Sequence, residues 1–278
     1  MNFFNKMNDL KQKVVVITGA SSGIGKACAE AFAIRGANLV LAARKYKTLC
    51  EIRDELKQKY QIQVIAIDCD VSKEEDCKNL IEEAVKTFKC IDILVNNAGI
   101  SMRALFKDVD LSVLKRVMDV NFWGVVYCTK YALPEIQKTR GTIIGISSVS
   151  GYKGTPGRIG YAASKFAMNG FLDALRIENL KTGVHVMTVC PGFTATNIRN
   201  AMLTNDGSEL GVSPRDENKM MTVESVANII VQGVIKRKRE IILTFEGKLT
   251  VILNKCFPSL TDKLIYQHFT KEKPPLLT

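Results

Sequence analysis

Short apolar runs alternate with longer segments of helical periodicity, and this alternation restricts the fold more than any other feature of the chain. The apolar runs are short and rich in β-branched residues, which is typical of buried strands. They lie at 13–18, 38–43, 63–67, 92–95, 142–146, 184–189 and 240–243. The helical segments lie at 23–35, 46–59, 73–88, 111–136, 161–180 and 223–235. Because strands that alternate with helices form parallel sheets, we expect a doubly wound α/β sheet of about seven strands with helices on both faces.

The chain of 278 residues has no proline-rich linker, internal repeat or low-complexity segment. We therefore expect one α/β domain over 13–244, with an N-terminal extension at 1–12 and an amphipathic tail at 245–278. Ligands of such a sheet bind beyond the carboxyl ends of the strands, at the point where the strand order reverses. Polar motifs that directly follow a strand are therefore the candidates for a functional site.

Composition narrows the choice of partners and compartment. The formal net charge of +11 favours anionic partners. Eight scattered cysteines without a C-x-x-C pair are typical of a reducing compartment, and only two histidines are present, so we expect no metal site. The N-terminus lacks the apolar core of a signal peptide, and no stretch reaches the ~18 apolar residues of a membrane span. These features predict a cytoplasmic protein.

A glycine-rich turn follows the first strand and leads directly into the first helix. Glycines at such a turn let the backbone approach a pyrophosphate, which the N-terminus of the helix then binds. Glycines also serve ordinary turns, but this position in an α/β alternation favours a dinucleotide. The residues expected to bind it are Gly19, Ser21, Ser22, Gly23, Ile24 and Gly25.

The spacing T-G-x-x-x-G-x-G resembles the signature of the short-chain dehydrogenase/reductase family, whose fold is of the Rossmann type. The pattern is nearest to the hydroxysteroid-dehydrogenase-like branch. Further motifs of this family follow in order from Lys13 to Leu243. The resemblance implies additional contacts to a nicotinamide dinucleotide from Asp70, Val71, Asn97, Ala98, Gly99, Pro191, Gly192, Phe193 and Thr196.

The end of the second strand bears on the choice between NADP(H) and NAD(H). An acidic residue there would bond the ribose 2′-hydroxyl of NAD and repel a 2′-phosphate, but this chain has Ala43 followed by Arg44 and Lys45. A guanidinium can bind a phosphate through two hydrogen bonds. The alternative is that Arg44 is a solvated loop cation. The sequence favours NADP(H) over NAD(H).

Tyr161 and Lys165 are four residues apart in a helical segment, so their side chains share one face. A neighbouring ammonium favours the phenolate and is expected to lower the pKa of the tyrosine, which could then exchange a proton with a carbonyl or alcohol oxygen. Ser148 lies thirteen residues before Tyr161, which is the serine spacing of the family, and its hydroxyl can bind the substrate oxygen. Asn121 matches the helix asparagine that connects the lysine to solvent through a water. A structural role for Asn121 is the alternative.

These features together predict an NADP(H)-dependent oxidoreductase that interconverts a secondary alcohol and a ketone, or an alcohol and an aldehyde. The alternative is a non-catalytic NADP(H) sensor on the same fold. The substrate is expected to be lipophilic because the loops after the fourth, fifth and sixth strands are apolar, with Met102, Leu105, Phe106, Tyr152, Met202 and Leu203. The family resemblance implies a homodimer or homotetramer, and no nucleic-acid motif is present.

The tail after 244 carries apolar residues at helical spacing, with lysines elsewhere on the helix. We expect an amphipathic helix packed on the domain or on a second subunit. The other interpretation is that this basic, apolar segment covers the substrate entrance and rests on a membrane surface.

Overall fold

The computed structural model describes residues 10–192, 194, 198, 201–211, 220–271 and 276. Within these residues, seven parallel strands form one sheet in the order β3-β2-β1-β4-β5-β6-β7. This confirms the predicted fold, and each strand end lies within one residue of its predicted position. The strands are β1 (Val14–Thr18), β2 (Asn38–Ala43), β3 (Val64–Asp68), β4 (Ile93–Asn96), β5 (Thr142–Ile146), β6 (His185–Cys190) and β7 (Glu240–Ile242).

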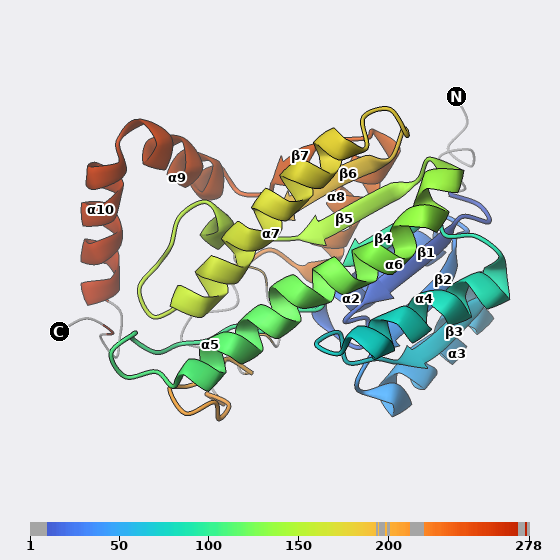
Figure 1. Ribbon diagram of the computed structural model, residues 1–278, viewed down its shortest axis with the longest axis horizontal. Coiled ribbons are helices and arrows are strands. Elements are labelled where there is room, and N and C mark those ends of the chain that lie inside the picture. The colour runs from blue at the N-terminus through green and yellow to red at the C-terminus, as the bar shows by residue number, and fades with distance from the viewer. Residues whose placement is uncertain are drawn as a thin grey trace.

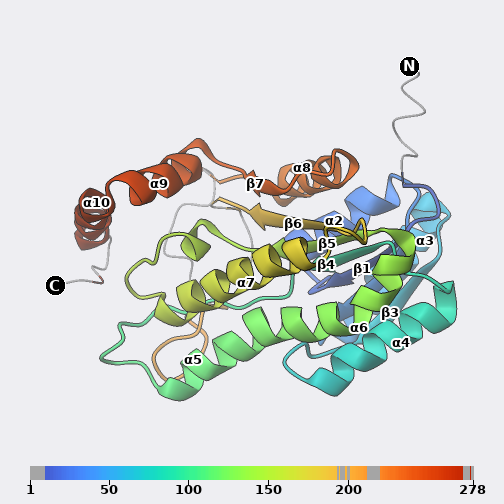
Figure 2. The same ribbon diagram turned by 45° about the horizontal axis from the view of Figure 1, so that its top comes forward.

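Helices cover both faces of the sheet (Figures 1 and 2). One apolar core lies between the sheet and α2, α3 and α8, and a second lies between the sheet and α4, α6 and α7. The bounds are α2 (Gly23–Ala33), α3 (Tyr46–Tyr60), α4 (Glu74–Phe88), α6 (Gly124–Thr139), α7 (Ile159–Glu178) and α8 (Val223–Ile235). Both faces of the central strands are buried, which explains their continuous apolar runs in the sequence.

The strand order reverses beside β1, which pairs with β2 on one side and with β4 on the other. The chain therefore leaves the ends of β1 and β4 toward opposite faces of the sheet. A crevice opens between such connections. This geometry places the glycine-rich turn after β1 next to the Asn97-Ala98-Gly99 segment after β4.

The segment predicted as one α-helix over 111–136 is interrupted by a π-helical turn. It consists of α5 (Leu111–Met118), the π-turn η1 (Asp119–Trp123) and α6. Asn121 lies in this turn, and its side chain is hydrogen-bonded to both backbone polar groups of Ile100. A π-turn adds one residue to the helix and often occurs at functional sites. The apolar periodicity that predicts the helix carries no signal for this added residue.

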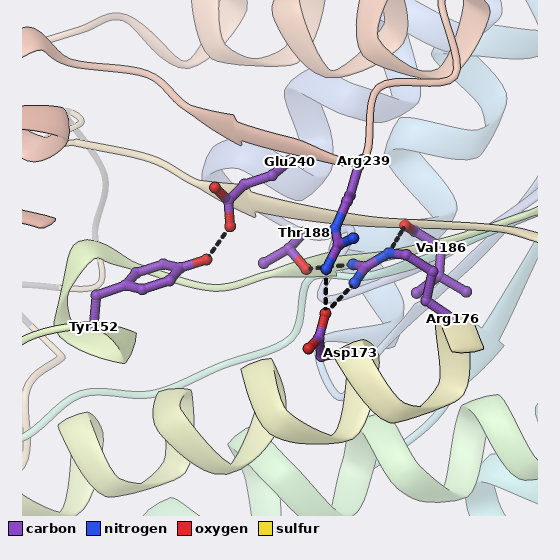
Figure 3. Close-up of polar contacts among 7 residues, drawn as sticks. All are labelled: Tyr152, Asp173, Arg176, Val186, Thr188, Arg239 and Glu240. Atoms are coloured by element: carbon purple, nitrogen blue, oxygen red, sulfur yellow. Dashed lines mark hydrogen bonds and ion pairs between the residues drawn. The ribbon is translucent and has the colours of Figure 1, made fainter. Parts of the chain in front are cut away.

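A polar network holds α7 against the last two strands (Figure 3). Arg176 of α7 donates to the carbonyl of Val186 at 3.1 Å, and Arg239 beside β7 donates to Asp173 of α7 at 2.7 Å. Tyr152, in the loop after β5, donates to Glu240 of β7. These contacts tie the helix and the loop that carry the predicted catalytic residues to the same edge of the sheet.

The tail forms two helices, α9 (Phe245–Cys256) and α10 (Pro258–Thr270), which stand beside the sheet domain at the left of Figure 1. Asn254 of α9 donates to the carbonyl of Tyr152 at 3.0 Å, and Asp262 of α10 pairs with Lys153. The tail therefore contacts the loop that follows β5. None of the helices described is long and apolar enough to cross a bilayer.

Gly145 of β5 lets α7 pack closely on the sheet. A Cβ on Gly145 would lie 2.4 Å from Leu172 Cδ1 and 3.3 Å from Met168 Sδ, and both side chains are fully buried. We predict that Gly145→Ala lowers the free energy of unfolding by ~1–3 kcal/mol through overpacking. Urea denaturation followed by circular dichroism measures this change.

Gly170 of α7 provides the matched control, because a Cβ there would have no described atom within 4 Å. Gly170→Ala is expected to raise the free energy of unfolding by ~0.5–1 kcal/mol through helix propensity. Equal effects of the two substitutions would contradict the packing account of Gly145.

Candidate active site

The carboxyl ends of the strands surround a cavity of about 700 Å³. Most of the residues predicted to bind the cofactor or substrate line it, although they come from six different strand ends and from helix α7. They are Gly19, Ser21, Ser22, Gly23, Ile24, Arg44, Asp70, Val71, Asn97, Ala98, Gly99, Ser148, Tyr161, Lys165, Pro191 and Gly192. Gly25 and Asn121 are not part of the lining, and Phe193 and Thr196 lie outside the described residues.

The turn after β1 requires glycine at three positions. Gly19 and Gly23 have positive φ angles of 66° and 54°, which residues other than glycine rarely adopt. A Cβ on Gly25 would lie 2.3 Å from the carbonyl oxygen of Gly19, so Gly25 acts by allowing close packing within the turn. The result is an exposed backbone cradle at the N-terminus of α2, which suits a pyrophosphate.

Thr18 and Asn97 join the turn after β1 to the segment after β4. The Thr18 hydroxyl accepts hydrogen bonds from the backbone amides of Asn97 and Ala98, both at 3.0 Å. The Asn97 side chain in turn donates to the carbonyls of Thr18 and Gly19, at 2.9 and 3.2 Å. Thr18 was not among the site residues predicted from the sequence, although its position directly before the first glycine of the turn was an available signal.

The adenosine end of the predicted dinucleotide site is lined by Arg44 and Asp70. Arg44 is exposed where β2 ends. Burial acts to raise the pKa of Asp70, but hydrogen bonds from Ser72 and the charge of Arg44 outweigh it and hold that pKa below its ordinary value. Asp70 is therefore a carboxylate at neutral pH, available to accept hydrogen bonds.

Tyr161 and Ser148 are brought together at the other end of the cavity. Burial raises the pKa of Tyr161 above its ordinary value, while a hydrogen bond with Ser148 and the charge of Arg158 oppose part of that rise. This differs from the expectation that the neighbouring ammonium of Lys165 would lower the pKa of Tyr161. The Lys165 Nζ atom lies 5.7 Å from the centroid of the Tyr161 ring, but desolvation of the phenolate dominates in the protein without ligand.

Lys165 and Asn121 meet around Gly99. Lys165 is buried and donates to the carbonyl of Ile146 at 2.8 Å, while Asn121 donates to Ser164 at 3.0 Å. A Cβ on Gly99 would lie 3.2 Å from Asn121 Oδ1 and 3.7 Å from Lys165 Nζ. Gly99 therefore leaves the space in which the two polar side chains approach each other. Burial lowers the pKa of Lys165 to about 8.

Most of the loop residues that were predicted to form an apolar substrate pocket do not line the cavity. Of the six side chains, Met202 lines the cavity, whereas Met102 and Leu203 belong to a separate apolar core and Phe106 is 63% exposed. Tyr152 is hydrogen-bonded to Glu240.

The tail instead provides an apolar wall to the cavity. Leu253 of α9 and Leu264, Ile265 and Phe269 of α10 all line it. The sequence pattern of the tail predicts a helix face but does not say which part of the domain that face covers. The alternative that the tail covers the substrate entrance agrees with this position.

The buried ammonium of Lys165 leads to a prediction about stability. Its pKa is about 8 in the folded protein and 10.5 ordinarily, so the unfolded state binds more protons between these values. Stability should therefore rise with pH in wild type relative to Lys165→Met, by about 3 kcal/mol across this window. Urea unfolding of both proteins from pH 7 to 10.5 measures it.

Lys181→Met, at an exposed position, controls for the loss of a positive charge. A stability difference between wild type and Lys165→Met that stays constant with pH would contradict the assignment of a depressed pKa to Lys165.

Comparison with known proteins agrees with this architecture. A model of the short chain dehydrogenase family matches residues 13–207. The 11-beta-hydroxysteroid dehydrogenase A of Sesamum indicum is 38% identical over 237 residues, which cover 83% of this chain and 68% of the relative. The dehydrogenase/reductase SDR family member 7B of Mus musculus is 34% identical over 269 residues, covering 95% of this chain and 83% of the relative.

Among solved structures, an alcohol dehydrogenase from the archaeon Thermococcus sibiricus, complexed with 5-hydroxy-NADP, superposes with a TM-score of 0.74 at 26% identity. The match covers 84% of this chain and 96% of that one. The fold, the motifs and these relatives agree with the resemblance found in the sequence. The chain belongs to the short-chain dehydrogenase family of oxidoreductases and has hydroxysteroid-dehydrogenase-like relatives.

Proposed function

We propose that this protein is an NADP(H)-dependent oxidoreductase that interconverts a lipophilic alcohol and the corresponding ketone or aldehyde. One observation carries the proposal. Tyr161 and Ser148 line the same cavity as the glycine cradle after β1 and Arg44 after β2. A proton-transfer pair and a phosphate-binding backbone thus lie within one crevice.

The residues that line the cavity fit a phosphorylated dinucleotide. Free backbone N–H groups at the start of α2 would bind the pyrophosphate, and Arg44 would bind the 2′-phosphate. Position 43, where an acidic side chain would repel this phosphate, is occupied by alanine. Asp70, Val71 and the 97–99 segment would hold the adenine and the nicotinamide ribose. The bound cofactor supplies the hydride chemistry.

Tyr161 would act as the acid and base on the substrate oxygen, and Ser148 would donate a hydrogen bond to that oxygen. During reduction, the Tyr161 hydroxyl gives its proton to the carbonyl oxygen. During oxidation, the phenolate takes the hydroxyl proton of the alcohol. Lys165 would favour the phenolate electrostatically, and Asn121 would keep the π-turn and the 99–101 segment in place beside it.

The apolar wall from Met202 and the tail supports a lipophilic substrate. Apolar side chains cannot satisfy charged groups of a ligand, so the part of the substrate against Leu264, Ile265 and Phe269 would be hydrocarbon. The alternative function, a non-catalytic sensor of NADP(H), leaves the contact between Tyr161 and Ser148 and the burial of Lys165 without a purpose. A catalytic role accounts for both.

We also infer a homo-oligomer and a cytoplasmic protein that contacts membranes peripherally. Trp123, Phe166 and Ile177 are exposed on the helices η1 and α7, a face suited to a second copy of the chain. Light scattering that gives a monomer mass would contradict the homo-oligomer.

The proposed membrane contact involves the tail. Phe257 and Tyr266 are exposed on the basic tail, as in an interfacial helix. Failure to float with anionic vesicles would contradict membrane contact.

Arg44 is expected to select NADP(H). Replacement by alanine removes a charged hydrogen-bond donor, so Arg44→Ala should weaken NADPH binding roughly 10- to 100-fold and change NADH binding by less than about threefold. Fluorescence titration of both proteins with both cofactors measures this. Equal weakening for NADPH and NADH would mean that Arg44 does not recognise the 2′-phosphate.

Tyr161 is expected to carry the proton transfer. In Tyr161→Phe the ring remains but the hydroxyl is lost, so kcat for a lipophilic ketone should fall by about 10²- to 10⁴-fold. The dissociation constant for NADPH should stay close to that of wild type, which excludes a folding defect. Steady-state oxidation of NADPH, followed by absorbance, gives kcat. Full turnover in this variant would exclude Tyr161 as the acid, whereas NADPH binding without any turnover in wild type would favour the sensor hypothesis.

A further inference from the structure

Arg158 lies one helical turn before Tyr161, at the start of α7. Its carbonyl accepts the amide of Ala162 at 2.8 Å, so Arg158 is the N-cap residue of the helix. Arg158 and Tyr161 both line the cavity. The Arg158 guanidinium is directed toward the 201–211 segment, where Nη2 lies 3.8 Å from Sδ of the buried Met202. The cation is therefore half-buried in the wall of the site.

The other groups that face Tyr161 differ from Arg158 in how they titrate. On α7, Lys165 is buried and its pKa falls to about 8, so its charge is lost in the mildly alkaline range. On β6, burial raises the pKa of Cys190 to about 12, so this thiol is neutral there. After β5, Ser148 contributes a neutral hydroxyl.

The apolar cluster around the Tyr161 ring consists of side chains from α5 together with Met102, Ala104, Val109 and Leu203. Among the described residues, the other ionisable groups in the cavity wall are Arg44, Lys45, Cys69, Asp70, Lys153, Glu209, Glu246 and His268. A guanidinium keeps its charge at all pH values that a protein tolerates. Arg158 therefore supplies a constant positive potential beside Tyr161 over the range in which Lys165 titrates.

We propose that Arg158 is a positioning residue for the proposed reaction, whose fixed charge stabilises the phenolate of Tyr161. This inference rests on the proposed role of Tyr161 as acid and base. The charge of Arg158 opposes the effect of burial on the pKa of Tyr161, and so moves that pKa toward the range in which the residue can exchange protons.

The ionisation of Tyr161 can be measured without any turnover. Protein labelled with ¹³Cζ-tyrosine is titrated by NMR, and the Tyr161 resonance is assigned by its loss in Tyr161→Phe. In Arg158→Met the titration midpoint of Tyr161 should move to higher pH, whereas in Arg158→Lys it should stay near that of wild type because the charge remains. An unchanged midpoint in Arg158→Met would overturn the inference.

The pH dependence of activity gives an independent readout. For oxidation of a lipophilic alcohol with NADP⁺, Arg158→Met should lower kcat/KM roughly three- to tenfold at pH 7, and the loss should disappear at high pH, where Tyr161 ionises without help. A loss of kcat/KM that is the same at every pH would overturn the inference, because it would show a role in packing or substrate contact. If wild type turns over no alcohol or carbonyl compound, the proposed function fails, and the NMR titration still decides the role of Arg158.

Discussion

The reciprocal hydrogen bonds between Thr18 and Asn97 are the interaction on which the rest of the site depends. They join the turns after β1 and β4, which lead to helices on opposite faces of the sheet. A parallel sheet in which the strand order reverses has a crevice at this point. Because the backbone amides of Asn97 and Ala98 are bonded to the buried Thr18 hydroxyl, the 97–99 segment is held against the glycine turn.

Glycines and a few polar side chains position helix α7 and its candidate catalytic residues beside this crevice. Gly145 lets α7 approach the sheet, and the Asp173–Arg239 contact holds the far part of that helix on β7. Lys165, on the same helix, is thereby buried beside Gly99, where its ammonium has a carbonyl partner but lacks bulk solvent. Desolvation of this kind makes the protonation of Lys165 and Tyr161 responsive to nearby charge. The site is thus both rigid and electrostatically tunable.

The sequence was sufficient to predict the fold, the strand ends and most of the residues that line the cavity. Periodicity and strand-end motifs act locally, and a parallel sheet places all carboxyl ends at one edge, so Gly19, Asp70 and Ser148 line one cavity because of the topology. What could not be predicted depends on tertiary contacts. The π-turn places the Asn121 side chain where it bonds to the backbone of Ile100, which is 21 residues away in sequence.

The apolar wall of the cavity is a second feature that could not be predicted from the sequence. Its side chains come from α9 and α10, whereas loop composition favoured Met102 and Leu203, which pack in a core of their own. The docking of the tail depends on contacts with Tyr152 and Lys153, and neither contact has a local sequence pattern. The effect of burial on the pKa of Tyr161 was missed for the same reason, because desolvation depends on the complete fold.

The most direct test of the central claim is a crystal structure of the protein with bound NADP⁺. The account predicts the pyrophosphate on the backbone between Gly19 and Gly25, the 2′-phosphate within hydrogen-bonding distance of Arg44, and the nicotinamide ring beside Tyr161. A dinucleotide bound with its nicotinamide away from Tyr161, or bound outside this crevice, would contradict the claim that the junction of β1 and β4 forms the catalytic cofactor site.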